Sequence, residues 1–373
     1  MNKTFRIVVP GIAAAAMAAS LTACGSSTNS GGSTSGSGSH IDLTSGGSSA
    51  QKDAQGAWTN GYNGGNVTYD GSQSSGIGKS KFTAGEYAFG GSDSALKEDA
   101  ATNTHELSKA TTHCGGIAPI EIPVYISPIA VVFNVPGVTA LNLDAATIAK
   151  IFSNKITNWN DPAIKALNPS ASLPSLPIQV AHRSTSSGTT NNFTDYLAKA
   201  APTDWTTAAS SDWPTSLANT GLKAAATSDM KQAVTGTSGA IGYIDASKDS
   251  GMGLVSVKVG SGYTAPSAAG AAADFADSKL KDATKSTELI YSVDRTPTNA
   301  ADYPITLVSY IIACQDYSKT SPMAASGTGA AVKAYLEYVT STDGQKTGSD
   351  AAKSAPLPAA IQAKVAAVVA TIK

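Results

Sequence analysis

A single arginine lies among small hydroxyl side chains in the stretch HRSTSSGTTNNFTDYL, residues 182–197. The guanidinium of Arg183 is a charged fork of donors that suits a tetrahedral oxyanion. The residues after Ser187 look helical, and the first amides of a helix have no acceptor within the helix. Small hydroxyl side chains add donors, and Gly188 lets an anion come close. The stretch therefore predicts one wall of an anion-binding pocket.

Two more segments share this design of a strand end, a small-residue loop and then a helix. They are TSGGSSAQ, residues 44–51, and DGSQSSGIG, residues 70–78. Serine and threonine also cap helices in proteins of every function, and Ser48 and Ser49 are good N-cap candidates. One such segment alone would carry little weight. Three of them with an arginine favour an anion site.

Asp93, in GGSDSA, is an acidic residue that at first sight conflicts with an anion site. A carboxylate only accepts hydrogen bonds, so it suits an anion that still carries a proton. Protonated phosphate can donate to Asp93, whereas sulfate would leave an unpaired charge and would be rejected. The alternative interpretation is an aspartate that caps a turn.

The composition excludes several classes of function. The chain has 26 basic and 27 acidic side chains, so we expect neither a nucleic acid nor another polyanion as partner. No G-x-S-x-G elbow occurs, and the four histidines form no paired metal motif. GIGKS, residues 76–80, imitates a phosphate-binding P-loop, but Gln73 occupies the position of its first glycine. A phosphatase or phosphoryl transferase is therefore the weaker alternative.

The N-terminus predicts export. Lys3 and Arg6 precede a short apolar run that ends in LTAC, residues 21–24. This resembles a bacterial lipobox, which implies a signal peptide over residues 1–23 and lipid attachment to Cys24. An ordinary secretory peptide is the alternative. Residues 24–40 then form a lipidated cysteine and a flexible Gly/Ser tether. We expect the protein on the outer face of the cytoplasmic membrane, anchored through Cys24.

The chain is long enough, at 373 residues, for about two domains. Strand patterns alternate with helix patterns, which predicts an α/β fold with mixed sheets. Prolines interrupt the β-rich run over 120–137 and suit edges and bends. We expect further strands at 66–71, 176–184 and 303–314, a strand and then a turn over 86–96, and a helix followed by a short strand over 224–244. We also expect helices within 48–62, 72–82, 329–341 and 357–372, and two helices within 143–167.

Two more cysteines, Cys114 and Cys314, follow the N-terminal segment. In an exported chain they can oxidise, and we favour a disulfide over two free thiols. They lie 200 positions apart, and if they pair, the chain between them leaves one domain and returns to it.

The order of the motifs resembles the phosphate-binding protein of bacterial ABC-type phosphate importers. The matching motifs are LTSGGSSAQ, YDGSQSSG, FGGSDSAL, IAVVFNVPGV, IFSNKITNWNDPAIKALNP, HRSTSSGTT, SGAIGY and YPIT. The resemblance implies a two-domain fold like that of type II periplasmic binding proteins. Domain I would comprise residues 41–135 and 302–373, and domain II residues 136–301. The crossings at 134–138 and 298–304 would form the hinge between them.

The resemblance also implies the ligand residues. The phosphate contacts would be Ser49, the backbone N–H of Ala50, Ser74, Asp93, Arg183, Ser187, Gly188 and Thr189. The sequence departs from the family at Thr185, because the arginine motif usually reads R-x-D-x-S-G-T. Thr185 thus replaces an aspartate that normally orients the arginine.

We therefore expect high-affinity capture of inorganic phosphate in an interdomain cleft and delivery to the membrane permease of an ABC importer. The resemblance implies a monomer without cofactor, metal or enzymatic activity. Two alternatives stay open: a binding protein for another oxyanion such as sulfate or molybdate, and a surface lipoprotein or adhesin with impaired phosphate binding.

Overall fold

The computed structural model describes residues 41–101, 103–217 and 220–373. The predicted signal peptide, the lipidated Cys24 and the tether lie outside these residues. Residues from Ile41 onward belong to one compact unit. Within the described part of the chain, no helix is both long and apolar enough to cross a membrane.

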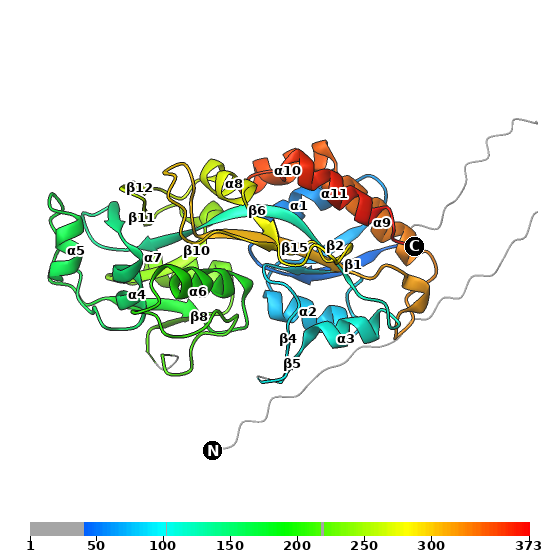
Figure 1. Ribbon diagram of the computed structural model, residues 1–373, viewed down its shortest axis with the longest axis horizontal. Helices are drawn as coiled ribbons and strands as arrows, with labels where there is room; N and C mark the ends of the chain where they lie inside the picture. Colours follow the sequence, from blue (N-terminus) through cyan, green and yellow to red (C-terminus); the bar gives the residue numbers. More distant parts are fainter. Residues whose placement is uncertain (1–40, 102, 218–219) are drawn as a thin grey trace, which may run out of the picture. The chain divides into compact units, whose positions relative to one another are not determined.

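One mixed sheet runs through this unit (Figure 1). Its strand order is β2-β1-β3-β15-β6-β10-β8-β9, and β11 pairs with β6, β7 and β12. The strands are β1 Leu43–Gly47, β2 Val67–Asp70, β3 Gly90–Ser92, β6 Ile120–Phe133, β7 Ala140–Leu143, β8 Gln179–Arg183, β9 Leu222–Ala224, β10 Ala240–Asp245, β11 Gly253–Val259, β12 Gly262–Thr264 and β15 Thr306–Ala313. Two short strand pairs lie apart from it: β4 Glu98–Asp99 with β5 Thr104–His105, and β13 Lys279–Leu280 with β14 Tyr291–Ser292.

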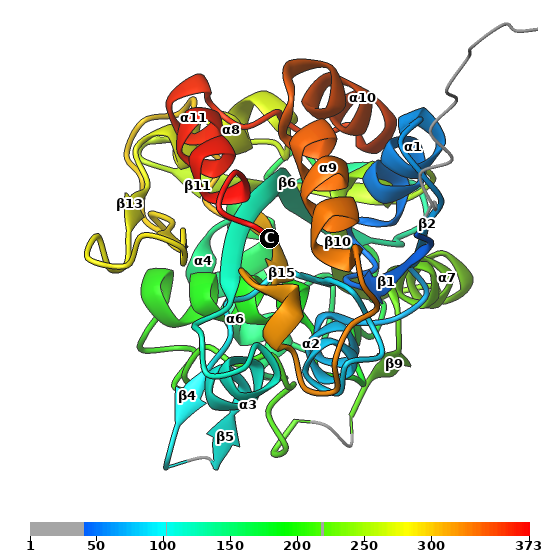
Figure 2. The same ribbon diagram turned by 90° about the vertical axis from the view of Figure 1, so that its right-hand side faces the viewer.

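Helices cover this sheet. They are α1 Lys52–Gly61, α2 Ser75–Thr83, α3 Glu106–His113, α4 Ala145–Phe152, α5 Pro162–Leu167, α6 Gly188–Ala200, α7 Thr227–Gly236, α8 Ala268–Ala276, α9 Thr328–Thr340, α10 Thr342–Ala352 and α11 Ala359–Val369, with 3₁₀ turns at Ala246–Lys248 and Tyr317–Lys319. Near β1, helices α1, α9, α10 and α11 lie on one face and α2 and α3 on the other (Figures 1 and 2). The predicted mixed α/β class is confirmed.

Strand β6 joins two halves of the sheet. It pairs antiparallel with β15 on one side and with β10 on the other. We call β1, β2, β3 and β15 with α1 and α2 the Asp93 half. We call β8, β9 and β10 with α6 and α7 the Arg183 half. The predicted domain boundaries and hinge crossings stay predictions.

The run over 120–137 corrects one sequence expectation. It forms a single central strand of 14 residues, buried along its whole length, rather than segments at edges and bends. Proline lacks the N–H that a sheet ladder needs, so its position in a central strand has to be compensated. Pro123 lies opposite Tyr310, where the register of β15 shifts between Ser309 and Tyr310, and Pro128 pairs with the first residue of β15. The two prolines thus fall where the ladder is already irregular or ends.

Most predicted elements are present close to their expected positions, with two differences. The first helix begins at Lys52 and its N-cap is Gln51, so the prediction of Ser48 or Ser49 as cap is wrong. Between the two expected closing helices the chain forms an additional helix, α10, whose N-cap Ser341 accepts from the amide of Gly344. This segment has a polar, glycine-containing sequence that gave no clear helical pattern.

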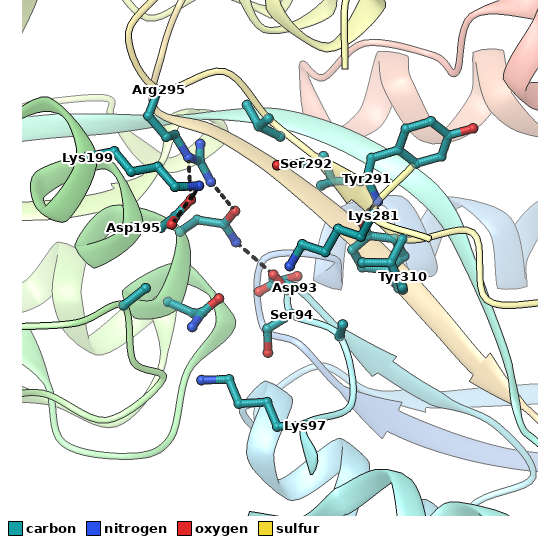
Figure 3. Close-up of a pocket in the computed structure, with 17 residues that line it drawn as sticks. Asp93, Ser94, Lys97, Asp195, Lys199, Lys281, Tyr291, Ser292, Arg295 and Tyr310 are labelled. Carbon is teal, nitrogen blue, oxygen red and sulfur yellow. Dashed lines mark hydrogen bonds and ion pairs between the residues drawn. The ribbon is translucent and has the colours of Figure 1, made fainter. Parts of the chain in front are cut away.

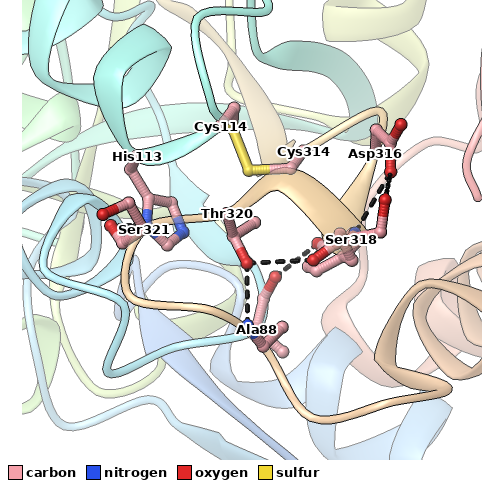
Figure 4. Close-up of a disulfide and its surroundings, with 10 residues drawn as sticks. Ala88, His113, Cys114, Cys314, Asp316, Ser318, Thr320 and Ser321 are labelled. Carbon is pink, nitrogen blue, oxygen red and sulfur yellow. Dashed lines mark hydrogen bonds between the residues drawn. A yellow bond between two sulfur atoms is a disulfide. The ribbon is translucent and has the colours of Figure 1, made fainter.

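The predicted disulfide is confirmed. Cys114 and Cys314 are bonded, and neither side chain is exposed (Figure 4). The bond ties the end of α3 to the end of β15. Next to it, the amide of Ser321 donates to the backbone oxygen of His113 at 2.8 Å. The disulfide therefore anchors both the start and the return of the 200-residue excursion.

Replacing both cysteines with serine is expected to lower the free energy of unfolding by about 3–5 kcal/mol. The crosslink closes a very long loop and so removes much of the conformational entropy of the unfolded chain. Urea unfolding of the double variant beside the oxidised wild type measures the difference, and reduced wild type is the control. A loss below about 1 kcal/mol would contradict this account.

Candidate anion-binding site

Four helix N-termini face one another where the two halves of the sheet meet. β1, β2 and β3 run parallel to one another, as do β8, β9 and β10. Helices α1, α2, α6 and α7 follow β1, β2, β8 and β9, and each begins just after the carboxyl end of its strand. In such sheets the carboxyl ends of the strands form the usual ligand crevice. The sequence predicted three of these N-termini and missed that of α7.

Asp93 follows β3 and is 3 % exposed. Its Oδ1 accepts from the hydroxyl of Ser48 at 2.5 Å and also from the hydroxyl of Ser309. Its Oδ2 accepts from Ser75 at 3.3 Å. A carboxylate has about four lone-pair positions. The three hydroxyls therefore leave one position on Oδ2 for a ligand that can donate a proton.

Burial raises the pKa of the Asp93 carboxyl. The hydroxyls of Ser309 and Ser48, the charge of Arg183 and the hydroxyl of Ser75 oppose that rise. The carboxyl is thus a buried acceptor whose charge is supported by specific donors. This is the environment expected of an acidic residue that discriminates between ligands by their protons.

Arg183 ends β8 and is 3 % exposed. One terminal nitrogen donates to Ser187 Oγ at 3.0 Å, and the other donates to the backbone oxygen of Ala225. Its Nε is buried and has no hydrogen-bond partner among the described residues. Burial lowers the pKa of the guanidinium, while the hydroxyl of Tyr243 and the carboxylate of Asp93 raise it. An unpartnered N–H on a buried cation is a donor position that an anion would satisfy.

Thr185, where the resemblance leads us to expect an aspartate, helps to hold the arginine. Thr185 Oγ1 accepts from Arg183 at 3.4 Å and donates to the backbone oxygen of Ala225 at 2.8 Å. That carbonyl supplies the main acceptor for the guanidinium. The guanidinium is thus held here by neutral acceptors, the hydroxyl of Thr185 and the main-chain oxygen of Ala225.

Helix α6 begins directly against Asp93. Its N-cap Ser187 accepts from the amide of Thr190 at 3.4 Å, so the hydroxyl proton is left for a ligand. Gly188 and Thr189 then supply the first helical amides. A Cβ placed on Gly188 would lie 2.5 Å from Cβ of Asp93. Glycine is therefore required for this approach, and the predicted residues Asp93, Arg183, Ser187, Gly188 and Thr189 come together.

The loop between β1 and α1 contacts the Arg183 half at the start of α7. Ser49 Oγ is 2.8 Å from Thr227 Oγ1 and accepts from the backbone amide of Thr227 at 3.2 Å. The backbone amide of Ala50, a predicted ligand donor, bonds to Ser48 Oγ at 3.2 Å. Ser49 and Ala50 thus lie beside the predicted pocket, with their polar groups directed to protein partners.

The start of α2, which follows the loop after β2, also contacts the Arg183 half. Ser74 is the N-cap of α2 and accepts from the amide of Ile77 at 3.4 Å. Two residues on, the amide of Gly76 donates to the backbone oxygen of Ser186 at 3.2 Å. Ser74 is buried, and accepting an amide leaves its hydroxyl proton for a ligand, as the prediction requires.

Besides Ser48, which was expected only as a helix cap, three further hydroxyl residues belong to the site and were missed. Ser75 and Ser309 hold Asp93, and Thr227 holds Ser49. Ser309 is a polar residue in the apolar strand β15, which is a usable signal, since buried polar groups need partners. Thr227 follows β9 and opens α7, which repeats the strand-loop-helix design without a glycine.

The loop after Asp93 is fastened by two buried charges. Lys79 Nζ donates at 2.9 Å to each of three oxygens, Ser94 Oγ, the backbone oxygen of Ala95 and Glu106 Oε2. The lysine of the GIGKS motif is therefore fully used by this loop. Glu121 Oε1 accepts from the amide of Leu96 at 2.8 Å.

Burial raises the pKa of Glu121 to about 7, against the opposing effects of the Leu96 amide and Lys79. Because the pKa of Glu121 is higher in the folded state, the protonated side chain stabilises the fold. This contribution to the unfolding free energy is fully present below its ordinary pKa of 4.5. That contribution is lost as the pH rises through about 7.

Glu121→Gln is accordingly expected to flatten the dependence of stability on pH. Glutamine keeps an acceptor for the Leu96 amide but cannot ionise. Relative to the variant, the wild type should lose on the order of 3 kcal/mol of unfolding free energy between pH 5 and pH 8. Urea unfolding at several pH values measures this, and Asp274, whose pKa burial also raises to about 7, is common to both proteins and cancels. Parallel curves for the two proteins would show that Glu121 does not titrate in this range.

A cavity of about 200 Å³ lies beside Asp93 (Figure 3). Of the predicted ligand residues only Asp93 lines it. The other lining groups come from the loop after Asp93, which carries Lys97, from α6 and Ala209, from the segment between β13 and β15, which carries Lys281, and from β15 itself. The predicted donors Ser74, Arg183 and Ser187 do not line this cavity, so it is distinct from the space that they surround.

Comparison with known proteins places the chain in a family. Residues 25–343 match the model of the PBP superfamily domain. Phosphate-binding protein PstS 2 of Mycobacterium tuberculosis is 35 % identical over 367 residues, which cover 94 % of this chain and 95 % of that protein. The chain belongs to the PBP superfamily and to this PstS family. PstS 3 of Mycobacterium leprae is 33 % identical over 79 % of this chain and 78 % of its own.

The PstS-family assignment agrees with solved structures of the same fold. A phosphate-bound periplasmic phosphate-binding protein called PfluDING has a TM-score of 0.68 and is 22 % identical, over 88 % of this chain and 93 % of its own. A phosphate-binding protein from Stenotrophomonas maltophilia has a TM-score of 0.65 at 21 % identity, over 88 % and 93 % of the two chains. These neighbours support the fold, and the roles of individual residues rest on the geometry above.

Proposed function

We propose that this protein binds inorganic phosphate outside the cytoplasmic membrane and delivers it to the permease of an ABC importer. Two facts support the proposal. Its relatives over nearly the whole chain are phosphate-binding proteins. Its own helix N-termini, small hydroxyl side chains and Arg183 converge where the two halves of the sheet meet.

The observation that carries the proposal is that a buried carboxylate, Asp93, and a buried guanidinium, Arg183, lie at the same site. A site for any oxyanion would use the arginine, the amides of α2 and α6, and the hydroxyls. A buried carboxylate with one unfilled acceptor position is useful only for an oxyanion that brings a proton. At neutral pH phosphate carries one and sulfate does not. The arrangement thus favours phosphate over the other oxyanions considered above.

The alternative of a surface lipoprotein with impaired binding rested on Thr185. The guanidinium of Arg183 is nevertheless held by Ser187, by Thr185 itself and by the backbone of Ala225. We therefore keep phosphate capture as the function. In this proposal the protein is a monomer anchored through lipid on Cys24, and it carries out no chemistry on its ligand and needs no cofactor.

Calorimetric titration of residues 41–373 tests the proposal. Phosphate should bind tightly with one site per chain, and sulfate at the same concentration should give no binding heat. An assay of p-nitrophenyl phosphate hydrolysis, with and without added divalent cations, should give no turnover. Absence of phosphate binding would refute phosphate capture, and equal binding of sulfate would refute the proton-based selection.

A further inference from the structure

A side-chain amide joins the two halves of the sheet directly behind the predicted site. Asn192 lies one turn into α6 and is 8 % exposed. Its Nδ2 donates to the backbone oxygen of Asp93 at 2.7 Å and to that of Gly188 at 2.9 Å. Figure 3 shows the first of these bonds ending at Asp93. Because Asn192 and Asp93 belong to different halves, this bond exists only while α6 lies against the Asp93 loop.

Arg295 fixes the orientation of that amide. One terminal nitrogen of Arg295 donates to Asn192 Oδ1 at 2.7 Å, and its Nε donates to Asp195 Oδ2 at 2.9 Å. A guanidinium has no acceptor, so the amide must turn its oxygen toward Arg295 and its nitrogen toward Asp93. Arg295 is itself only 4 % exposed, and the resulting bonds are shielded from water.

The same arginine is tied to the strand that carries a partner of Asp93. Its remaining terminal nitrogen donates to the backbone oxygens of Pro304 at 3.1 Å and Thr306 at 2.7 Å. Thr306 begins β15, and Ser309 on that strand donates to the Asp93 carboxylate. The contacts thus form a closed circuit from β15 through Arg295 and Asn192 to Asp93, and through Ser309 back to β15.

We infer that Asn192 is a positioning residue that holds the site closed around phosphate, and that Arg295 keeps its amide in the bonding orientation. The inference rests on the proposed function. Asn192 does not supply a ligand contact in this account. It sets how long α6, with Ser187, Gly188 and Thr189, stays against Asp93. Its loss should therefore increase the rate of phosphate release and leave capture almost unchanged.

Stopped-flow kinetics with inorganic phosphate test this inference. Asn192→Ala should release phosphate about tenfold faster, the effect of about one lost hydrogen bond, with an association rate within about twofold of wild type. Asn192→Asp keeps the acceptor for Arg295 but sets a carboxylate against two carbonyl oxygens, so its release should be at least as fast as that of Asn192→Ala. Asn191→Ala, the neighbouring asparagine on the same helix, is the matched control and should behave as wild type.

If Asn192 merely stabilised α6, Asn192→Asp would release phosphate as slowly as wild type, and that result would overturn the inference. A second readout does not depend on phosphate. Spin labels on Ser80→Cys in α2 and Gln232→Cys in α7, both exposed positions, report the separation of the two halves in ligand-free protein. Asn192→Ala should shift the distances between the spin labels to longer values. An unchanged distance distribution would contradict the proposed role of Asn192 in holding the two halves together. Should wild type bind no phosphate, the proposed function fails and the distance measurement alone decides the role of Asn192.

Discussion

Gly188→Ala is expected to weaken phosphate binding by roughly 10- to 100-fold. The added methyl carbon would lie 2.5 Å from Cβ, 2.6 Å from the carbonyl carbon and 2.7 Å from Cα of Asp93. Carbon atoms in contact are normally separated by about 3.5–4 Å, so α6 or the Asp93 loop has to move. Both carry predicted ligand groups, and overpacking of this kind typically costs about 1–3 kcal/mol.

The effect of Gly188→Ala is expected on binding rather than on folding. The added methyl group clashes with Asp93 only while the two halves lie against each other. Ligand-free protein can avoid this clash by separating the halves. Calorimetric affinity and the unfolding free energy without phosphate are the two measurements. Gly56→Ala in α1 is the control, because a methyl group there has no neighbour within 4 Å. An unaltered affinity in Gly188→Ala would show that α6 does not need this close approach.

Asp93→Asn should weaken phosphate binding by roughly 10- to 100-fold and admit sulfate. Asparagine replaces one carboxylate oxygen with an NH₂ group. The proton of the ligand then has no acceptor at that position. A hydrogen bond to a charged group is worth about 1.5–3 kcal/mol, which sets the size of the effect. The same NH₂ group can donate to fully ionised sulfate, so the selectivity should reverse or disappear.

The hydroxyls around Asp93 sharpen this expectation. Ser48 and Ser309 both donate to Oδ1, so the asparagine oxygen should remain there and its nitrogen should take the Oδ2 position beside Ser75. That position is the one left for the ligand. Titration of the variant with phosphate and sulfate makes the comparison, with Asp343→Asn, an exposed aspartate of α10, as the control. If Asp93→Asn still excluded sulfate, the selection would not depend on a ligand proton.

Sequence reasoning succeeded where a functional residue belongs to a local pattern. Arg183, Ser187 and Gly188 are contiguous with a strand and a helix start, so their sequence alone indicated that they lie at a helix N-terminus. The strands β2, β8 and β15 were likewise found from their apolar patterns. These signals are short-range, because helix N-termini and strand alternation depend on neighbours in the sequence.

It failed where a role depends on a distant partner. Ser48 looked like a helix cap, yet it serves Asp93, 45 positions further along the chain. Arg295 lies in an irregular segment, and its partner Asn192 is 103 positions away. Pro123 was expected at an edge or a bend, because the shifted register of β15 opposite it cannot be seen in the sequence. No local pattern contains these pairings, because they arise from the order of strands in the sheet.

The position of phosphate in a crystal structure of residues 41–373 tests the central claim most directly. The account predicts one phosphate between the N-termini of α2 and α6. Its oxygens should be within hydrogen-bond distance of Arg183, Ser187 and the amides of Gly188 and Thr189. One phosphate oxygen should be close to Asp93 Oδ2. Phosphate found instead beside Lys97 and Lys281 in the neighbouring cavity, with Arg183 making no contact to it, would contradict the account.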